Sequence, residues 1–229
     1  MGFIKSCFLA LALLPSLAFA NWTLPEDAIN NIGDFAACNF DGGQTVTCNA
    51  AITLTTVDAA LVLTQNLNLV INGAFTTADG ITINPNNSYV LNIQLGNNNF
   101  SMNGDNAVIN ADITAANITI SGLETIINGD LNALANVSVA SGPTVNGDII
   151  AGGSVANSGL INGKVTTAGS FANASGAVLS GRVDASGGVQ NSGTVTSNID
   201  AVGSVTNSSG AAAGSINSES PVVNDGTVL

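Results

Sequence analysis

Between residues 109 and 218, one seven-residue pattern of apolar and small positions returns at regular intervals: apolar, any, small, any, apolar, any, small. The seven copies begin at Ile109, Ile127, Val145, Ile161, Leu179, Val195 and Ala212. Their start positions therefore differ by 18, 18, 16, 18, 16 and 17 residues. A repeat of about 17 residues is too short for a helix pair or a propeller blade, but it suits one turn of a solenoid built from short strands.

The pattern predicts an all-β fold, a single parallel β-solenoid (β-helix), and we expect its coil to be right-handed. Alternate residues of each copy would face the interior, because side chains alternate across a strand. The small third residue is a glycine in most copies, for example Gly129 and Gly147. We expect it at an inward position of a bend, where little more than a hydrogen atom fits.

A second element follows most copies: an apolar residue, any residue, and then an asparagine close to a glycine. The asparagine lies on the same side of the strand as the apolar residue. Stacked turns would place these asparagines above one another, so that their amides bond along the stack, as in cross-β assemblies. The predicted ladder consists of Asn157, Asn173, Asn191, Asn207 and Asn224.

Residues 1–20 have the pattern of a secretory signal peptide. Lys5 supplies the positive charge, residues 8–14 form an apolar run, and Ala18 and Ala20 match a cleavage site. The alternative is a membrane anchor, but the apolar run is too short for a span. We expect an exported chain in the periplasm, at the cell surface or outside the cell, with no transmembrane segment.

We assign residues 21–50 to an N-terminal cap and residues 51–229 to the solenoid. Signal cleavage would leave Cys38 and Cys48 as the remaining cysteines. A pair ten residues apart in an exported chain favours a disulfide over a metal site, since zinc needs more ligands and the chain contains no histidine. The bridge would fix the start of the solenoid.

A short helix is predicted inside this cap. Thr23 would cap it, acidic residues follow in its first turn, and Ile29, Ile32 and Phe35 lie at helical spacing. The helix would cover the first turn, because the uncovered end of a solenoid is an open strand edge.

Strand-like alternation begins after Cys48, and no linker divides the chain. Asparagine-rich stretches interrupt the alternation, and the stretch at residues 84–88 (Asn-Pro-Asn-Asn-Ser) predicts a loop between turns.

Charge and composition limit the function classes. The chain has 3 basic and 15 acidic residues, a net charge of −12 and no histidine. Lys164 and Arg182 are the basic residues beyond the signal peptide, so a basic patch for nucleic acid or anionic lipid is excluded. Polysaccharide-cleaving solenoids need clustered carboxylates and usually a basic residue, and histidine is the commonest general base. We therefore expect no enzyme activity and no cofactor.

In each copy, the residue directly before the central apolar position faces outward, and these residues stack into one column. It runs through Asp112, Asp130, Asp148, Lys164, Arg182, Asn198 and Ser215. Three carboxylates stacked at about 4.8 Å repel one another, so they either extend into water or hold a cation such as Ca²⁺. We favour the solvated face, with Asp148 and Lys164 as a cross-turn ion pair, because the Gly-Gly-x-Gly-x-Asp calcium repeat does not occur.

Ice binding would require a flat array of threonines. We expect Thr76, Thr114 and Thr166 to share a column, but other turns place Asn132 or Ile150 there, so the array is too mixed.

The segments Asn-Gly-Asp-Leu (128–131) and Asn-Gly-Asp-Ile (146–149) are similar to bactofilin repeats, which often carry Gly-Asp-Ile/Val-x-Ala. The resemblance covers roughly residues 71–226. Bactofilins are polymer-forming cytoskeletal β-helix proteins, so the resemblance implies head-to-tail filaments. They are typically cytosolic, whereas this chain has a signal peptide and a cysteine pair. Those two features resemble exported β-helix segments of surface and pilus-accessory proteins of the MSHA biogenesis type, and neither family brings catalytic residues.

These observations lead to three hypotheses. The first is a non-enzymatic structural β-helix protein of the bacterial cell envelope or surface, self-associating end to end through its last turn. The second is an adhesin that binds a glycan or a cell-surface protein through a polar face. The third is a carbohydrate-active enzyme.

Overall fold

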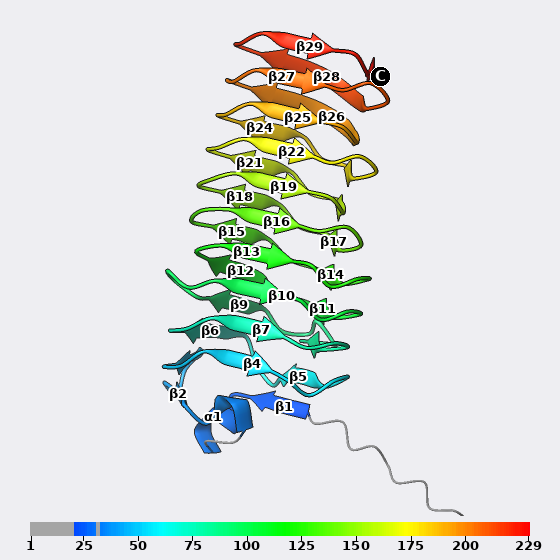
Figure 1. Cartoon of the computed structure of the whole chain (residues 1–229). Coiled ribbons are helices and arrows are strands. Elements are labelled where there is room, and N and C mark those ends of the chain that lie inside the picture. Colours follow the sequence, from blue (N-terminus) through cyan, green and yellow to red (C-terminus); the bar gives the residue numbers. More distant parts are fainter. Residues whose placement is uncertain (1–20, 31–32) are drawn as a thin grey trace, which may run out of the picture.

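The structure, a computed structural model, describes residues 21–30 and 33–229 as a tall stack of β-coils (Figure 1). The predicted signal peptide lies outside these described residues. The chain forms about nine turns of parallel strands with very little helix, which confirms the predicted all-β solenoid. The turns contain about 18 residues, one more than predicted, because the N-terminal turns are longer than the C-terminal ones.

Each turn contributes strands to three columns, which form three faces of the rod. The first face contains β5 (Ala60–Leu63), β8 (Thr82–Ile83), β11 (Val108–Ile109), β14 (Ile126–Ile127), β17 (Thr144–Val145), β20 (Leu160–Ile161), β23 (Val178–Leu179) and β30 (Thr227–Val228). The second contains β3 (Thr45–Cys48), β6 (Leu67–Ile71), β9 (Leu91–Gln94), β12 (Asp112–Ala115), β15 (Leu131–Ala133), β18 (Ile149–Ala151), β21 (Val165–Thr167) and β24 (Val183–Ala185). Strands β26 (Thr194–Ala201) and β28 (Ala212–Ser218) run through both faces.

The third face is a separate sheet of ten parallel strands. It contains β4 (Ile52–Leu54), β7 (Phe75–Thr77), β10 (Phe100–Met102), β13 (Ile118–Ile120), β16 (Val137–Val139), β19 (Val155–Asn157), β22 (Phe171–Asn173), β25 (Val189–Asn191), β27 (Val205–Asn207) and β29 (Val222–Asn224).

The register follows the apolar pattern of the sequence. One inward column on the second face runs through Ile93, Ile113, Leu131, Ile149, Val165, Val183, Ile199 and Ile216. All of these except Ile216, in the last turns, are fully buried. Phe75 and Phe100 stack in the interior of the third face, with ring centroids 5.6 Å apart. Burial of these aliphatic and aromatic columns is the main force that holds the turns together.

The glycines of the seven-residue pattern occupy a corner and are half-exposed, so the expected inward position is wrong. A Cβ atom on Gly147 would overlap with the carbonyl oxygen of Gly129 one turn earlier, and the same relation links Gly163 to Gly147. At this corner the backbones of successive turns approach so closely that no side chain fits between them.

The N-terminal end of the stack is covered. Strand β1 (Asn21–Leu24) pairs in parallel with β5 and is followed by the five-residue helix α1 (Glu26–Asn30) and the short 3-10 helix η1 (Gly33–Phe35). Thr23 lies in β1, so its predicted role as helix cap is wrong. Its backbone N–H instead donates to Asp27 Oδ2 at 2.8 Å. Ile32 lies outside the described residues.

A disulfide between Cys38 and Cys48 is present, as predicted. It joins β2 (Cys38–Phe40) to β3 in an antiparallel hairpin. Because β3 also pairs in parallel with β6, the stack reaches back into the segment that we assigned to the cap.

The opposite end of the described chain is uncovered (Figure 1). Val222 and Val228 lie in register with the buried Val205 and Ala213 of the preceding turn, yet both are exposed. The apolar columns therefore continue into exposed residues in the last turn of the described chain.

Candidate functional site

The predicted asparagine ladder is present at the C-terminal half of the third face, and all of its members except Asn224 are buried. Four links join its five members: Asn157 Nδ2 donates to Asn173 Oδ1 at 2.9 Å, Asn173 to Asn191 at 2.9 Å, Asn191 to Asn207 at 2.8 Å and Asn207 to Asn224 at 2.7 Å. Each of the four donors also bonds a backbone carbonyl oxygen of the first face, for example Thr194 O at 3.2 Å from Asn173. The amides of the four donors are committed to the fold, so the ladder is a structural element.

A second ladder, which the sequence analysis did not identify, follows the corner between the first and second faces. Asn128 Nδ2 donates to Asn110 Oδ1 at 2.7 Å, Asn146 to Asn128 at 2.6 Å, and Asn162 to Asn146 at 2.7 Å. The signal was available, because in three of these four positions the asparagine directly precedes a corner glycine.

The acidic column carries the residues that we considered for calcium. Asp112 Oδ1 accepts a hydrogen bond from the backbone N–H of Asp130 at 2.8 Å, and Asp130 Oδ1 accepts one from Asp148 at 2.8 Å. Each carboxylate therefore bonds the backbone of the next turn, a third arrangement beside the free carboxylates and the bound cation that we considered. Among the described residues, no group of three or more His, Cys, Asp or Glu side chains converges in a geometry that would hold a metal ion.

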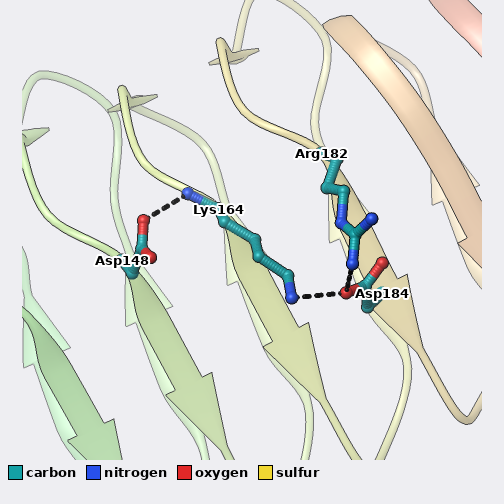
Figure 2. Close-up of polar contacts among 4 residues, drawn as sticks. All are labelled: Asp148, Lys164, Arg182 and Asp184. Carbon is teal, nitrogen blue, oxygen red and sulfur yellow. Dashed lines mark hydrogen bonds and ion pairs between the residues drawn. The ribbon is translucent and has the colours of Figure 1, made fainter.

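The charged residues that follow in this column form a cluster on the second face (Figure 2). Asp148 contacts Lys164 through the backbone N–H, at 2.8 Å, and so the predicted side-chain ion pair between them is wrong. The Lys164 ammonium lies 2.5 Å from Asp184 Oδ2, and Arg182 Nη2 lies 2.7 Å from the same oxygen. The long Lys164 side chain reaches across to the neighbouring column of the next turn, which a pairing along one column could not predict.

A groove of about 340 Å³ begins beside this cluster and is lined by Asp184, Asp200 and Glu219. Partial burial favours the neutral form of Asp184, but its bonds to Lys164 and Arg182 outweigh burial and hold the pKa of its carboxyl group below the usual value. A glycosidase acid needs the opposite shift, a raised pKa. Asp184 is therefore suited to an ion pair and not to proton donation.

The threonines that we assigned to one column lie on two faces. Thr114 and Thr166 belong to the second face, whereas Thr76 pairs with Thr53 and Ser101 on the third. The prediction that these three threonines share one column was therefore wrong.

Exposed residues also occur at the predicted loop. Residues 85–90 are exposed at the corner between the first and second faces, and Tyr89, which the sequence analysis did not single out, lines hollows of about 190 and 260 Å³. The longer spacing between strands at this point is the signal in the sequence that identifies the loop as an insertion.

Comparisons of the chain with protein-family models, with curated proteins and with solved structures found no match. Across the described residues, the structure holds no helix with the length and apolar character that a membrane span requires.

Proposed function

We propose that this chain is a non-enzymatic structural rod of the bacterial cell envelope, exported from the cytoplasm, and that two copies join end to end through their last turns. The observation that carries the proposal is the uncovered last turn, where Val222 and Val228 continue buried columns into solvent. Apolar residues and free strand edges at one end of a sheet favour pairing with another chain.

The two ends of the rod differ, and this affects the kind of assembly. The N-terminal end is covered by β1, α1 and the β2–β3 hairpin, whereas β29 and β30 leave backbone edges open. Contact between two open ends is isologous and closes after two copies. We therefore favour a pair of rods over the head-to-tail filament implied by the bactofilin resemblance.

The contact area limits the strength of this association. One side of a turn has about six residues, or roughly 20 Å at about 3.3 Å per residue. A triangle of that size presents an end of roughly 170 Å², well below the about 800 Å² per partner of stable complexes. We therefore expect a weak, concentration-dependent association supported by strand pairing.

The ladders and the disulfide support the structural and exported parts of the proposal. Asparagine and aspartate side chains at the corner between the first and second faces bond to the equivalent residue of a neighbouring turn, which stiffens the stack. A disulfide is typical of proteins that work outside the reducing cytosol.

The test uses a protein of residues 21–229 and compares substitutions at two exposed valines. Val228 in the last turn is 46% exposed, and Val202 on the side of the rod is 48% exposed. Because both are solvent-accessible, Val228→Asp and Val202→Asp should both fold. Sedimentation velocity over a concentration series would measure association, and negative-stain electron microscopy would measure rod length.

We expect the wild type and Val202→Asp to form rods of doubled length at high concentration, while Val228→Asp stays single. Ile216→Asp, which places a charge deeper in the same end, should also stay single. A wild type that remains single at every concentration would refute end association, and equal loss in Val228→Asp and Val202→Asp would show that the contact is elsewhere.

A second candidate function is a binding module of the cell surface. The insertion loop at residues 84–90 favours it, because function in repeat proteins concentrates at insertions that interrupt the repeat.

A further inference from the structure

The insertion loop is a local departure from an otherwise regular stack. In the C-terminal half, equivalent strand residues are 16 to 18 apart, as from Leu131 to Ile149 and from Ile149 to Val165. Thr82 and its equivalent Val108 are 26 apart. The extra length forms the loop at the corner, beside the start of the second asparagine ladder.

A clamp of buried amides holds the base of this loop. Asn84 Nδ2 donates to Tyr89 O at 2.8 Å and to Asn110 O at 3.1 Å, and Asn110 Nδ2 donates in return to Asn84 O at 2.9 Å. Both asparagine side chains are buried. At the end of the loop, the Val90 N–H donates to Asn66 Oδ1 at 2.9 Å. The loop is therefore fixed before any ligand arrives, which lowers the entropy lost on binding.

The backbone of the loop is strained as well as fixed. Asn84 and Asn87 have φ angles of 55° and 46°, in the left-handed region that is unfavourable for residues other than glycine. Asparagine tolerates this region best, and such strain is found preferentially at functional sites. The surrounding bonds hold the loop in a shape that local preferences alone would not select.

Tyr89 is the aromatic side chain that this loop presents to solvent. It is 38% exposed, whereas Trp22 and the phenylalanines at 35, 75, 100 and 171 are buried among the described residues. Among those residues its phenolic oxygen has no hydrogen-bond partner in the structure. The side chain therefore offers both an apolar ring and a free hydroxyl group.

Tyr89 lines two hollows, and Ser88 belongs to the lining of both. The hollow of about 190 Å³ also contains Asn110, Asp112 and Asn128 in its lining. The hollow of about 260 Å³ has Asn84, Pro85 and Asn86 in its lining. Each hollow is smaller than the about 300–1,000 Å³ that is typical of small-ligand sites, and the two share Ser88 and Tyr89 in their linings.

We propose that this loop is a binding site for a neutral glycan. A sugar ring presents an apolar C–H face, which packs on an aromatic ring, and a rim of hydroxyl groups, which bond amide, hydroxyl and carboxylate side chains. Tyr89 supplies the ring, and Ser88, Asn128 and Asp112 line the adjoining hollow with polar groups. The net charge of −12 and the nearby Asp112 disfavour glycans that carry carboxylate or sulfate groups.

The test is a ¹⁵N NMR titration of residues 21–229 in the Val228→Asp background. That background keeps the loop and removes the proposed end contact, so the two proposals succeed or fail separately. The probes are neutral trisaccharides of glucose, galactose, mannose and N-acetylglucosamine, with sialyllactose as the acidic comparison. We expect one or more neutral probes to shift amide signals of residues 84–91, 110–112 and 128, with a dissociation constant on the order of 1 mM.

Variants assign the binding to the aromatic ring. Tyr89→Ala should weaken binding about tenfold or more, and Tyr89→Phe should keep most of the affinity because the stacking face remains. Leu123→Ala is the matched control, since Leu123 is 57% exposed at a different corner. It should bind like the parent chain.

Four outcomes would overturn the proposal. They are the absence of shifts with every neutral probe at about 10 mM, shifts that cluster away from the loop, tighter binding of sialyllactose than of any neutral probe, and unchanged binding by Tyr89→Ala.

Discussion

Asn191→Ala removes the most fully bonded member of the buried ladder. The Asn191 side chain is completely buried and makes four hydrogen bonds. Its Nδ2 donates to Asn207 Oδ1 at 2.8 Å and to Ala212 O at 2.9 Å, and its Oδ1 accepts from Asn173 Nδ2 at 2.9 Å and from the Gly193 N–H at 3.3 Å.

The expected loss follows from these bonds. A typical intramolecular hydrogen bond contributes about 1 kcal/mol net, and a buried group left without a partner costs about 1–3 kcal/mol. Asn173 retains its bond to Thr194 O, so part of the loss is recovered. We expect Asn191→Ala to lower the free energy of unfolding by about 3–5 kcal/mol.

Asn128→Ala is the matched comparison. Asn128 also links two turns, through 2.7 and 2.6 Å bonds to Asn110 and Asn146, but it lies on the exposed corner. Water can replace both bonds there, and so we expect a loss of about 0.5–1 kcal/mol. Asn191 and Asn128 each bond two other asparagines, so the difference in the loss of stability would come from the burial of Asn191.

Urea unfolding followed by far-ultraviolet circular dichroism would measure both variants, with the slope of the transition as a check on cooperativity. A shallower slope for Asn191→Ala would indicate that the C-terminal turns separate from the rest of the stack. Equal losses for Asn191→Ala and Asn128→Ala, within about 0.5 kcal/mol, would refute the reasoning.

The same measurement tests two further changes. Gly147→Ala should destabilise the chain by about 3 kcal/mol or more, because the new Cβ overlaps the carbonyl of Gly129. Gly96→Ala should cost only about 1–2 kcal/mol, because Gly96 has a φ of 56° but no atom within 4 Å of the added carbon, and similar losses for the two would contradict the close approach of turns. Thr77→Val should raise the stability by about 1 kcal/mol, since Thr77 Oγ1 is buried without a partner among the described residues, and a less stable variant would show that this oxygen is satisfied in solution.

The repeat spacing was the part of the fold most accessible from the sequence. Inward residues must coincide from turn to turn, because a shift by one residue would turn a buried strand to the solvent. The positions of Asn157 and Asn173, two residues after an inward apolar residue, then fix them on the same interior side and directly above one another. The spacing therefore predicts the buried ladder without knowledge of the corners.

Contacts between side chains of different columns were harder to predict from the sequence. Strands of the second and third faces both have short alternating patterns, and so alternation alone could not separate Thr76 from Thr114. The partner of Lys164 was missed because a long side chain reaches a neighbouring column. Tyr89 was missed because a loop without periodicity carries no register.

By itself, the sequence determined the number of residues per turn to within one, the inward columns, the disulfide and the buried asparagine ladder, since each depends on spacing along the chain. Only the tertiary structure decided the direction of the corner glycines, the partner of Lys164 and the surroundings of Tyr89. These features depend on how the chain bends between strands and on which turns lie side by side. The period of alternating residues fixes neither, because backbone angles at corners and the reach of side chains vary independently of it.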